Sequence, residues 1–169
     1  GIEADMQAYK SAIGLNHDFA DAHKNLGMLL LLKGDFLNGW AEYEWRWRCD
    51  DLSDFWRKRN FPQPLLSSPD VQDKSVLIWA EQGVGDQIMF ISILGDIDYC
   101  TSEVTVECEE RLVPLFRRSF SGFNFIAAKT PPDRRLFDQC IDYQIPIGNL
   151  GKWFRVIESD FCENNPYLV

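Results

Sequence analysis

The chain has 169 residues, of which 46% are hydrophobic, 14% aromatic and 25% charged. These proportions exclude a disordered, collagen-like or fibrous protein, and the length suffices for one ordinary domain or two small ones. The formal net charge of -9 opposes binding to phosphate backbones and to anionic lipid surfaces. We therefore expect no nucleic-acid partner.

The five cysteines include no Cys-x-x-Cys pair, and most of them lie far along the chain from the two histidines, His17 and His23. Because a zinc site needs clustered ligands, we predict no metal site and interpret the thiols as reduced core residues of a cytoplasmic protein. The longest apolar run, Met28 to Leu32, is far shorter than the roughly 18 residues that a membrane span needs. We expect no membrane span, and no basic-then-apolar signal pattern precedes the first helix.

Residues 1–49 carry helical periodicity. Apolar side chains between Ala22 and Leu32 fall on one helical stripe, and Gly34-Asp35 is a signal that stops one helix and starts another. Over residues 36–48 the aromatic side chains recur at three- and four-residue spacing, which predicts a second helix packed through an aromatic face. The pattern predicts an antiparallel helical hairpin.

An internal repeat runs through this helical part. Tyr9 to Ala12 aligns with Tyr43 to Arg46, 34 positions further on, which is the tetratricopeptide period. In that register Leu26-Gly27 falls on the Leu-Gly pair of the repeat, and Gly39 stands where a small Ala is usual. The region resembles tetratricopeptide repeats, which bury their faces by stacking on one another.

Residues 50–73 contain Pro62, Pro64 and Pro69 and are interpreted as a proline-rich linker or docking loop. Residues 74–169 then alternate short apolar runs with helical patterns: strands at 74–80, 103–107, 123–127 and 139–147, and helices after the first strand and at 111–120. Right-handed crossovers between such strands give a doubly wound, mainly parallel sheet. We predict an α/β protein in which a helical hairpin precedes a Rossmann-like domain.

The first strand of this domain passes into a glycine loop, Glu81 to Ile88, that opens a helix. Ligands of α/β folds bind at such strand-to-helix turns. Dinucleotide binding is one alternative, since Gly83-x-Gly85 follows a strand and Glu107 ends the next one. The third glycine of that fingerprint is replaced by Ile88, and Asp86 stands where a pyrophosphate would need unopposed N–H donors.

Asp86 admits two interpretations on its position alone. A carboxylate at a helix N-terminus is favoured by the macrodipole and by free backbone N–H groups, so Asp86 fits a helix cap. It also fits a general base that takes the proton of an attacking hydroxyl.

Three stretches occur in the order and spacing of a known family: Gly34 to Arg48, Phe61 to Leu65, and Trp79 to Gln87. The chain resembles bacterial tetratricopeptide-repeat glycosyltransferases, relatives of the lipopolysaccharide heptosyltransferases and of O-linked N-acetylglucosamine transferases. The resemblance implies the N-terminal, acceptor-side half of a GT-B enzyme, with the nucleotide-sugar donor bound by a half that follows Val169. It also implies that neither a metal nor a cofactor is required.

The resemblance makes Asp86 the candidate base, with the acceptor side lined by its loop neighbours Gln82, Gly83, Val84, Gly85 and Gln87. The expected acceptor is a hydroxyl of a protein or glycan, and the fragment alone should be inactive. The rival interpretations are a repeat-based protein-interaction module with a non-catalytic Rossmann-like domain, and a dinucleotide-binding domain.

Overall fold

The computed structural model describes residues 1–50, 59–97, 103–161 and 166–169. The chain divides into two compact units, one made of Gly1–Arg57 with Arg155–Phe161 and the other of Lys58–Phe154 with Cys162–Val169. The chain is therefore mixed α/β, with helices in the first unit and a parallel sheet in the second. No helix among the described residues is long and apolar enough to cross a membrane.

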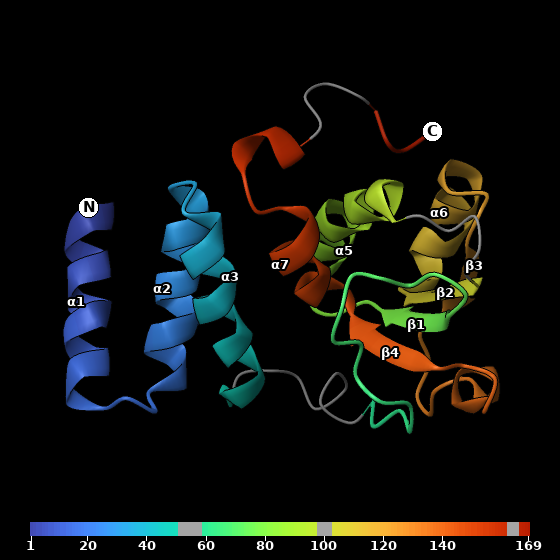
Figure 1. Ribbon diagram of the computed structural model, residues 1–169, viewed down its shortest axis with the longest axis horizontal. Helices are drawn as coiled ribbons and strands as arrows, with labels where there is room; N and C mark the ends of the chain where they lie inside the picture. The colour runs from blue at the N-terminus through green and yellow to red at the C-terminus, as the bar shows by residue number, and fades with distance from the viewer. Residues whose placement is uncertain (51–58, 98–102, 162–165) are drawn as a thin grey trace. The chain divides into compact units, whose positions relative to one another are not determined.

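The helical unit contains α1 (Ile2–Leu15), α2 (Ala20–Leu32) and α3 (Phe36–Tyr43) (Figure 1). Met6 of α1 packs with Leu26 and Leu30 of α2 to form a buried cluster. The N-cap of the third helix is Asp35, whose side chain accepts a hydrogen bond from the backbone N–H of Asn38 at 3.4 Å. Local sequence signals thus place the helix and its start as expected.

The expected helix over 36–48 is only partly formed. The α-helix ends at Tyr43, and Glu44–Arg48 continue as the 3₁₀ helix η1. Arg46 is 2% exposed, and its Nη1 donates to the Tyr43 carbonyl at 3.1 Å while its guanidinium lies over the Tyr43 and Trp47 rings. The Arg46 side chain thus donates a hydrogen bond to a carbonyl at the end of α3, where the last carbonyls of an α-helix lack an α-helical partner. This is compatible with the tighter 3₁₀ turn that follows.

Helices α2 and α3 approach so closely that two glycines are required between them. A Cβ placed on Gly27 would lie 2.6 Å from the backbone nitrogen of Tyr43, and one on Gly39 would lie 2.8 Å from the side chain of Leu31. Neither contact is compatible with van der Waals radii, and the first involves backbone that cannot rotate away. Gly39 therefore replaces the usual Ala because this crossing leaves no room for a methyl group.

His23 ties the helices together at another point. Its ring is stacked on Trp45 with centroids 3.8 Å apart, its Nδ1 lies 2.5 Å from Glu42 Oε2, and its Nε2 lies 3.0 Å from the carbonyl oxygen of His17. The imidazole thus joins the α1–α2 connection to α3 and η1.

The second unit is a four-stranded sheet with the order β3-β2-β1-β4, and every pairing in it is parallel. The strands are β1 (Ser75–Trp79), β2 (Glu103–Cys108), β3 (Asn124–Ala127) and β4 (Tyr143–Pro146). The fourth is shorter than the expected 139–147, because the Asp138 side chain accepts from the Cys140 N–H at 2.9 Å and holds a turn before the strand. The predicted parallel α/β sheet is confirmed.

Helices α5 (Val84–Ile91), α6 (Val113–Ser119) and α7 (Gly151–Phe154) cover one face of this sheet (Figure 1). Three 3₁₀ helices flank them: η2 (Ser92–Asp96), η3 (Glu110–Leu112) and η5 (Ile147–Leu150). The other face is covered by η4 (Arg134–Phe137) and by the segment around Phe61. The Phe61 ring lies 6.3 Å from that of Trp79 and 5.5 Å from that of Phe137.

Part of the stretch interpreted as a linker, 50–73, packs on the sheet. Leu65 forms a parallel bridge with Gln144 of β4, and the N–H of Leu66 donates to the Gln144 carbonyl at 2.9 Å. Phe61, Leu66 and Val71 are buried. Near the other end of the chain, Arg155–Phe161 belong to the helical unit. The sequence alone predicts these residues within the 74–169 domain.

The close crossing of α2 and α3 can be tested with one methyl group. We expect Gly27→Ala to lower the free energy of unfolding by about 1–3 kcal/mol, because the new Cβ forces the two helices apart. Gly14→Ala is the matched control, since a Cβ at Gly14 of α1 meets nothing within 4 Å. In denaturant titrations the control should be neutral or slightly stabilising, by up to about 1 kcal/mol. Equal effects of the two substitutions would contradict the crossing.

Candidate functional site

The candidate site lies where the strand order reverses. From β1 the chain moves to β2 and β3 on one side, and β4 lies on the other side of β1. In parallel sheets the carboxyl ends of the two strands that flank this reversal leave a crevice between their loops. Here those loops are residues 80–83 after β1 and η5 after β4.

A buried carboxylate joins these two loops. Glu81 is 0% exposed, and its Oε1 accepts the backbone N–H of Gly148 in η5 at 2.9 Å. A carboxylate that accepts a backbone N–H in a buried place fixes the distance between the two segments. Glu81 was not among the residues predicted for the site, although it opens the glycine motif.

The strained residue of the glycine loop is not a glycine. Gln82 has a φ of 65°, in the left-handed region, whereas Gly83 has a φ of -78°. A Cβ on Gly85 would meet no atom of the described residues within 4 Å, and one on Gly83 would meet only the Asp86 carboxylate at 3.4 Å. The backbone conformation and internal packing of this unit therefore do not require glycine at 85.

Asp86 belongs to the first turn of α5, and its carboxylate turns back to the start of the helix. Its Oδ2 accepts the backbone N–H of Gly83, the N-cap residue, at 3.1 Å. The side chain is half-buried, and its Oδ1 has no hydrogen bond among the described residues. The structure thus places Asp86 in the capping arrangement, with one carboxylate oxygen held and the other available.

Gln87 lies inside the protein rather than on an open rim. It is 2% exposed, its Oε1 accepts the N–H of Glu109 at 2.9 Å, and its Nε2 donates to the Gln82 carbonyl at 3.3 Å. Both ends of the amide are therefore used to join the loop after β1 to the loop after β2. Gln82, Val84 and Asp86 are half-buried and Gly83 and Gly85 are exposed, so these five predicted site residues reach the surface and Gln87 does not.

A buried ion pair stands at the carboxyl end of β2. Glu107 and Arg59 are 0% and 3% exposed, and Arg59 Nε lies 3.1 Å from Glu107 Oε2. Arg59 Nη1 also donates to the Lys129 carbonyl, after β3, at 2.8 Å. Burial raises the pKa of Glu107 to about 7, an effect that Arg59 opposes and Asp133 reinforces.

This pair argues against the dinucleotide alternative. In that alternative, Glu107 is the acidic residue at the end of the second strand that would bind the ribose. Its carboxylate faces the buried Arg59 and no solvent. Burial also lowers the pKa of Arg59, but a guanidinium keeps its charge in proteins. Sequence patterns gave no signal for the pair, since its partners are 48 positions apart and neither residue type predicts burial.

Among the cavities of the sheet unit, two are lined by described residues away from the glycine loop. One is apolar and enclosed between the sheet and the residues around Leu150 and Phe154. The other is a groove near the amino ends of the strands, lined by Ser75, Glu103 and Asn124 among others. Within the described part of the chain, no group of three or more His, Cys, Asp or Glu side chains could hold a metal ion.

Comparison with known proteins gives one informative match. The chain is 30% identical over 177 aligned positions to Protein FlbA of Caulobacter vibrioides, and the match covers 98% of this chain. It covers 29% of FlbA, so the chain spans less than a third of the length of that relative. No family model and no solved structure matches the chain.

The buried carboxyl of Glu107 predicts a pH-dependent stability. Its pKa is about 7 in the folded chain against 4.5 ordinarily, so the folded state holds a proton that the unfolded chain has released. The contribution of the protonated Glu107 carboxyl to the free energy of unfolding is thus complete below pH 4.5 and is lost as the pH rises through 7. We expect the free energy of unfolding to fall by roughly 3 kcal/mol across this range.

Glu107→Gln should remove most of this slope, because an amide does not titrate. Glu103→Gln, which changes an exposed carboxylate on the same strand, should leave it in place. The measurement is a series of denaturant titrations at fixed ionic strength between pH 4.5 and 8. Parallel curves for wild type and Glu107→Gln would show that Glu107 is ionised throughout.

Proposed function

We propose that this chain is the acceptor-side part of a glycosyltransferase, which transfers a sugar from a nucleotide-sugar donor to a hydroxyl of a protein or glycan. The observation that carries the proposal is the placement of Gly83-x-Gly85 at the reversal of strand order in a parallel β3-β2-β1-β4 sheet. Open space beyond Gly85 would let an acceptor approach the backbone there. On this proposal the sheet unit is the first Rossmann-like half of a GT-B enzyme.

The helical unit supports the same family assignment. Gly27 and Gly39 occupy the two small-residue positions at which helices of one tetratricopeptide repeat would cross, and both are in backbone contact range of the opposite helix. With the 34-residue spacing, this favours a tetratricopeptide hairpin over an unrelated helical pair. Its role would be to bind a protein acceptor or partner.

Asp86 is the proposed general base. As the hydroxyl oxygen of the acceptor attacks the anomeric carbon, the bond from that carbon to the nucleotide phosphate breaks, and the hydroxyl proton passes to the carboxylate. The hydrogen bond from Gly83 to Oδ2 would orient the carboxylate and leave Oδ1 for the proton. Capping the helix and accepting a proton are compatible roles, since each uses a different oxygen. No metal or cofactor enters this step.

We place the donor-binding part outside these 169 residues, because the family resemblance makes them only the acceptor-side half of such an enzyme. Gln87 acts in this scheme through its neighbours, because its amide fixes the loop rather than contacting the acceptor. Dinucleotide binding is not proposed, since Glu107 is engaged with Arg59.

A repeat-based interaction module is the second candidate. The close crossing of α2 and α3 favours it, because it builds a rigid helical surface without any contribution from the glycine loop. The two candidates differ in whether the loop is needed, which the next experiments address.

The isolated chain should turn over no nucleotide sugar, since only one wall of the proposed cleft is present. Release of free nucleotide from a panel of UDP-, GDP- and CMP-sugars measures this directly. Sustained turnover by the chain alone would disprove the division into acceptor and donor parts.

Two substitutions in the full-length protein that carries this chain test the loop. Asp86→Asn should lower the turnover of the full-length enzyme by about 10²–10⁴-fold, as expected for loss of a general base. Gly85→Leu should reduce acceptor binding while changing the free energy of unfolding by no more than about 0.5 kcal/mol, because its side chain enters open space.

Gly95→Leu is the matched control for Gly85→Leu, since a Cβ at Gly95 also meets nothing within 4 Å and Gly95 lies in η2, away from the loop. It should keep full activity. Wild-type turnover of both Asp86→Asn and Gly85→Leu would instead favour the interaction module.

A further inference from the structure

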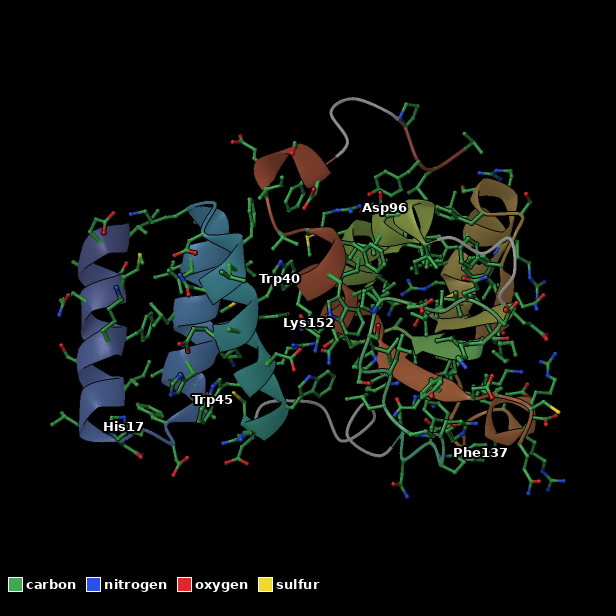
Figure 2. All side chains as sticks on the ribbon, viewed as in Figure 1. His17, Trp40, Trp45, Asp96, Phe137 and Lys152 are labelled. Atoms are coloured by element: carbon green, nitrogen blue, oxygen red, sulfur yellow. The ribbon has the colours of Figure 1, made fainter. Side chains whose placement is uncertain are left out.

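A segment from far along the chain lies against the aromatic side of α3. The indole N–H of Trp40, which is labelled in Figure 2, donates to the buried carbonyl of Arg155 at 2.7 Å. The ring of Phe36 lies 4.8 Å from that of Phe161. Both contacts belong to the helical unit, which includes Arg155–Phe161. We call these seven residues the strap.

The strap is closed on itself by hydrogen bonds. Asp160 Oδ2 accepts the N–H groups of Val156 and Ile157 at 2.7 and 3.0 Å, around the 3₁₀ turn η6 (Glu158–Asp160). The Arg155 guanidinium lies 5.7 Å from the centre of the Phe161 ring, so the two ends of the strap meet. These bonds lower the pKa of Asp160 and keep it an acceptor at neutral pH. A preorganised turn of this kind docks with little further loss of entropy.

The surface that the strap covers is the one that another helix would use. Phe36 and Trp40 are one turn apart on α3, beside the Gly39 side that packs on α2. In stacked helical repeats such an aromatic face is buried by the next helix pair, and an end unit needs a cap. Trp40 is only 8% exposed here, and its indole N–H is bonded to the strap.

We propose that Arg155–Phe161 is a built-in end cap, which closes the α3 face against stacking by a second copy of this chain. Without the cap, the exposed Phe36 and Trp40 rings would form a self-complementary aromatic patch. The two contacts that hold the strap to α3, Trp40 with Arg155 and Phe36 with Phe161, do not involve the glycine loop.

Hydrogen exchange of the Trp40 indole N–H reads the cap directly. In the whole chain this proton should exchange slowly, and Asp160→Ala should accelerate it by about tenfold or more by opening the strap. Glu158→Ala changes an exposed carboxylate of the same turn and should have no such effect. Rapid exchange of this proton in the wild-type chain, or equal exchange rates in the two variants, would contradict the proposal that the strap caps α3.

Self-association provides the second readout. Phe161→Ser should convert a monomer into a concentration-dependent dimer in sedimentation experiments, whereas Ile157→Ser should stay monomeric. Ile157 is the matched control because it lies in the strap with 59% of its surface exposed. A Phe161→Ser variant that remains monomeric with a protected Trp40 indole contradicts the proposal.

Where Phe161→Ser does not fold, Trp40→Phe answers the same question, because it keeps an aromatic ring on α3 but removes the indole donor together with part of the ring system. Backbone exchange at Val156 and Ile157 should then rise by about tenfold. Unchanged exchange at both amides would show that the strap is held by something other than α3.

Discussion

The arrangement of the sheet unit depends on how its loops satisfy backbone groups at the carboxyl ends of the strands. Parallel strands leave these groups without ladder partners, and burying them unpaired is costly. Two buried side chains supply these partners. The Glu81 carboxylate accepts the N–H of Gly148, and the Gln87 amide donates to the Gln82 carbonyl and accepts the N–H of Glu109. The loops after β1, β2 and β4 are therefore held by two buried side chains, and the start of α5 is fixed with them.

This constraint separates the roles of neighbouring residues in the glycine motif. The Gln87 side chain has a structural role, because its amide donates to the backbone carbonyl of Gln82. The predicted site residues that reach the surface are Gln82, Val84 and Asp86, which are half-buried, and the two glycines, which are exposed. Chemistry at this edge would therefore use these residues, because the side chains of Glu81 and Gln87 hold the loop in place.

Much of the fold could be predicted from local patterns. The helical stripe, the Gly34-Asp35 break and the four strand positions are local signals, and each produced the expected element. The errors lie where side chains override the pattern: Arg46 beside the turn that ends α3, and Asp138 at the turn that shortens β4. Contacts between distant residues had no local signal, as with Arg59 and Glu107, or Trp40 and Arg155, which are 115 positions apart. The candidate site residues stay a prediction, and the sequence did not indicate that Gln87 is buried, because burial is not encoded in spacing.

Three glycines illustrate how the same residue type serves opposite purposes. At Gly27 and Gly39 a methyl group would collide with atoms of the opposite helix, so the absence of a side chain is explained by packing within the unit. At Gly85 the same methyl group would meet no described atom, and the helical backbone there accepts any L-residue. Internal packing therefore does not account for the choice of glycine over alanine at this position. A group from outside these residues that approaches the backbone beside Asp86 would account for it, and in the function proposed above that group is the sugar acceptor.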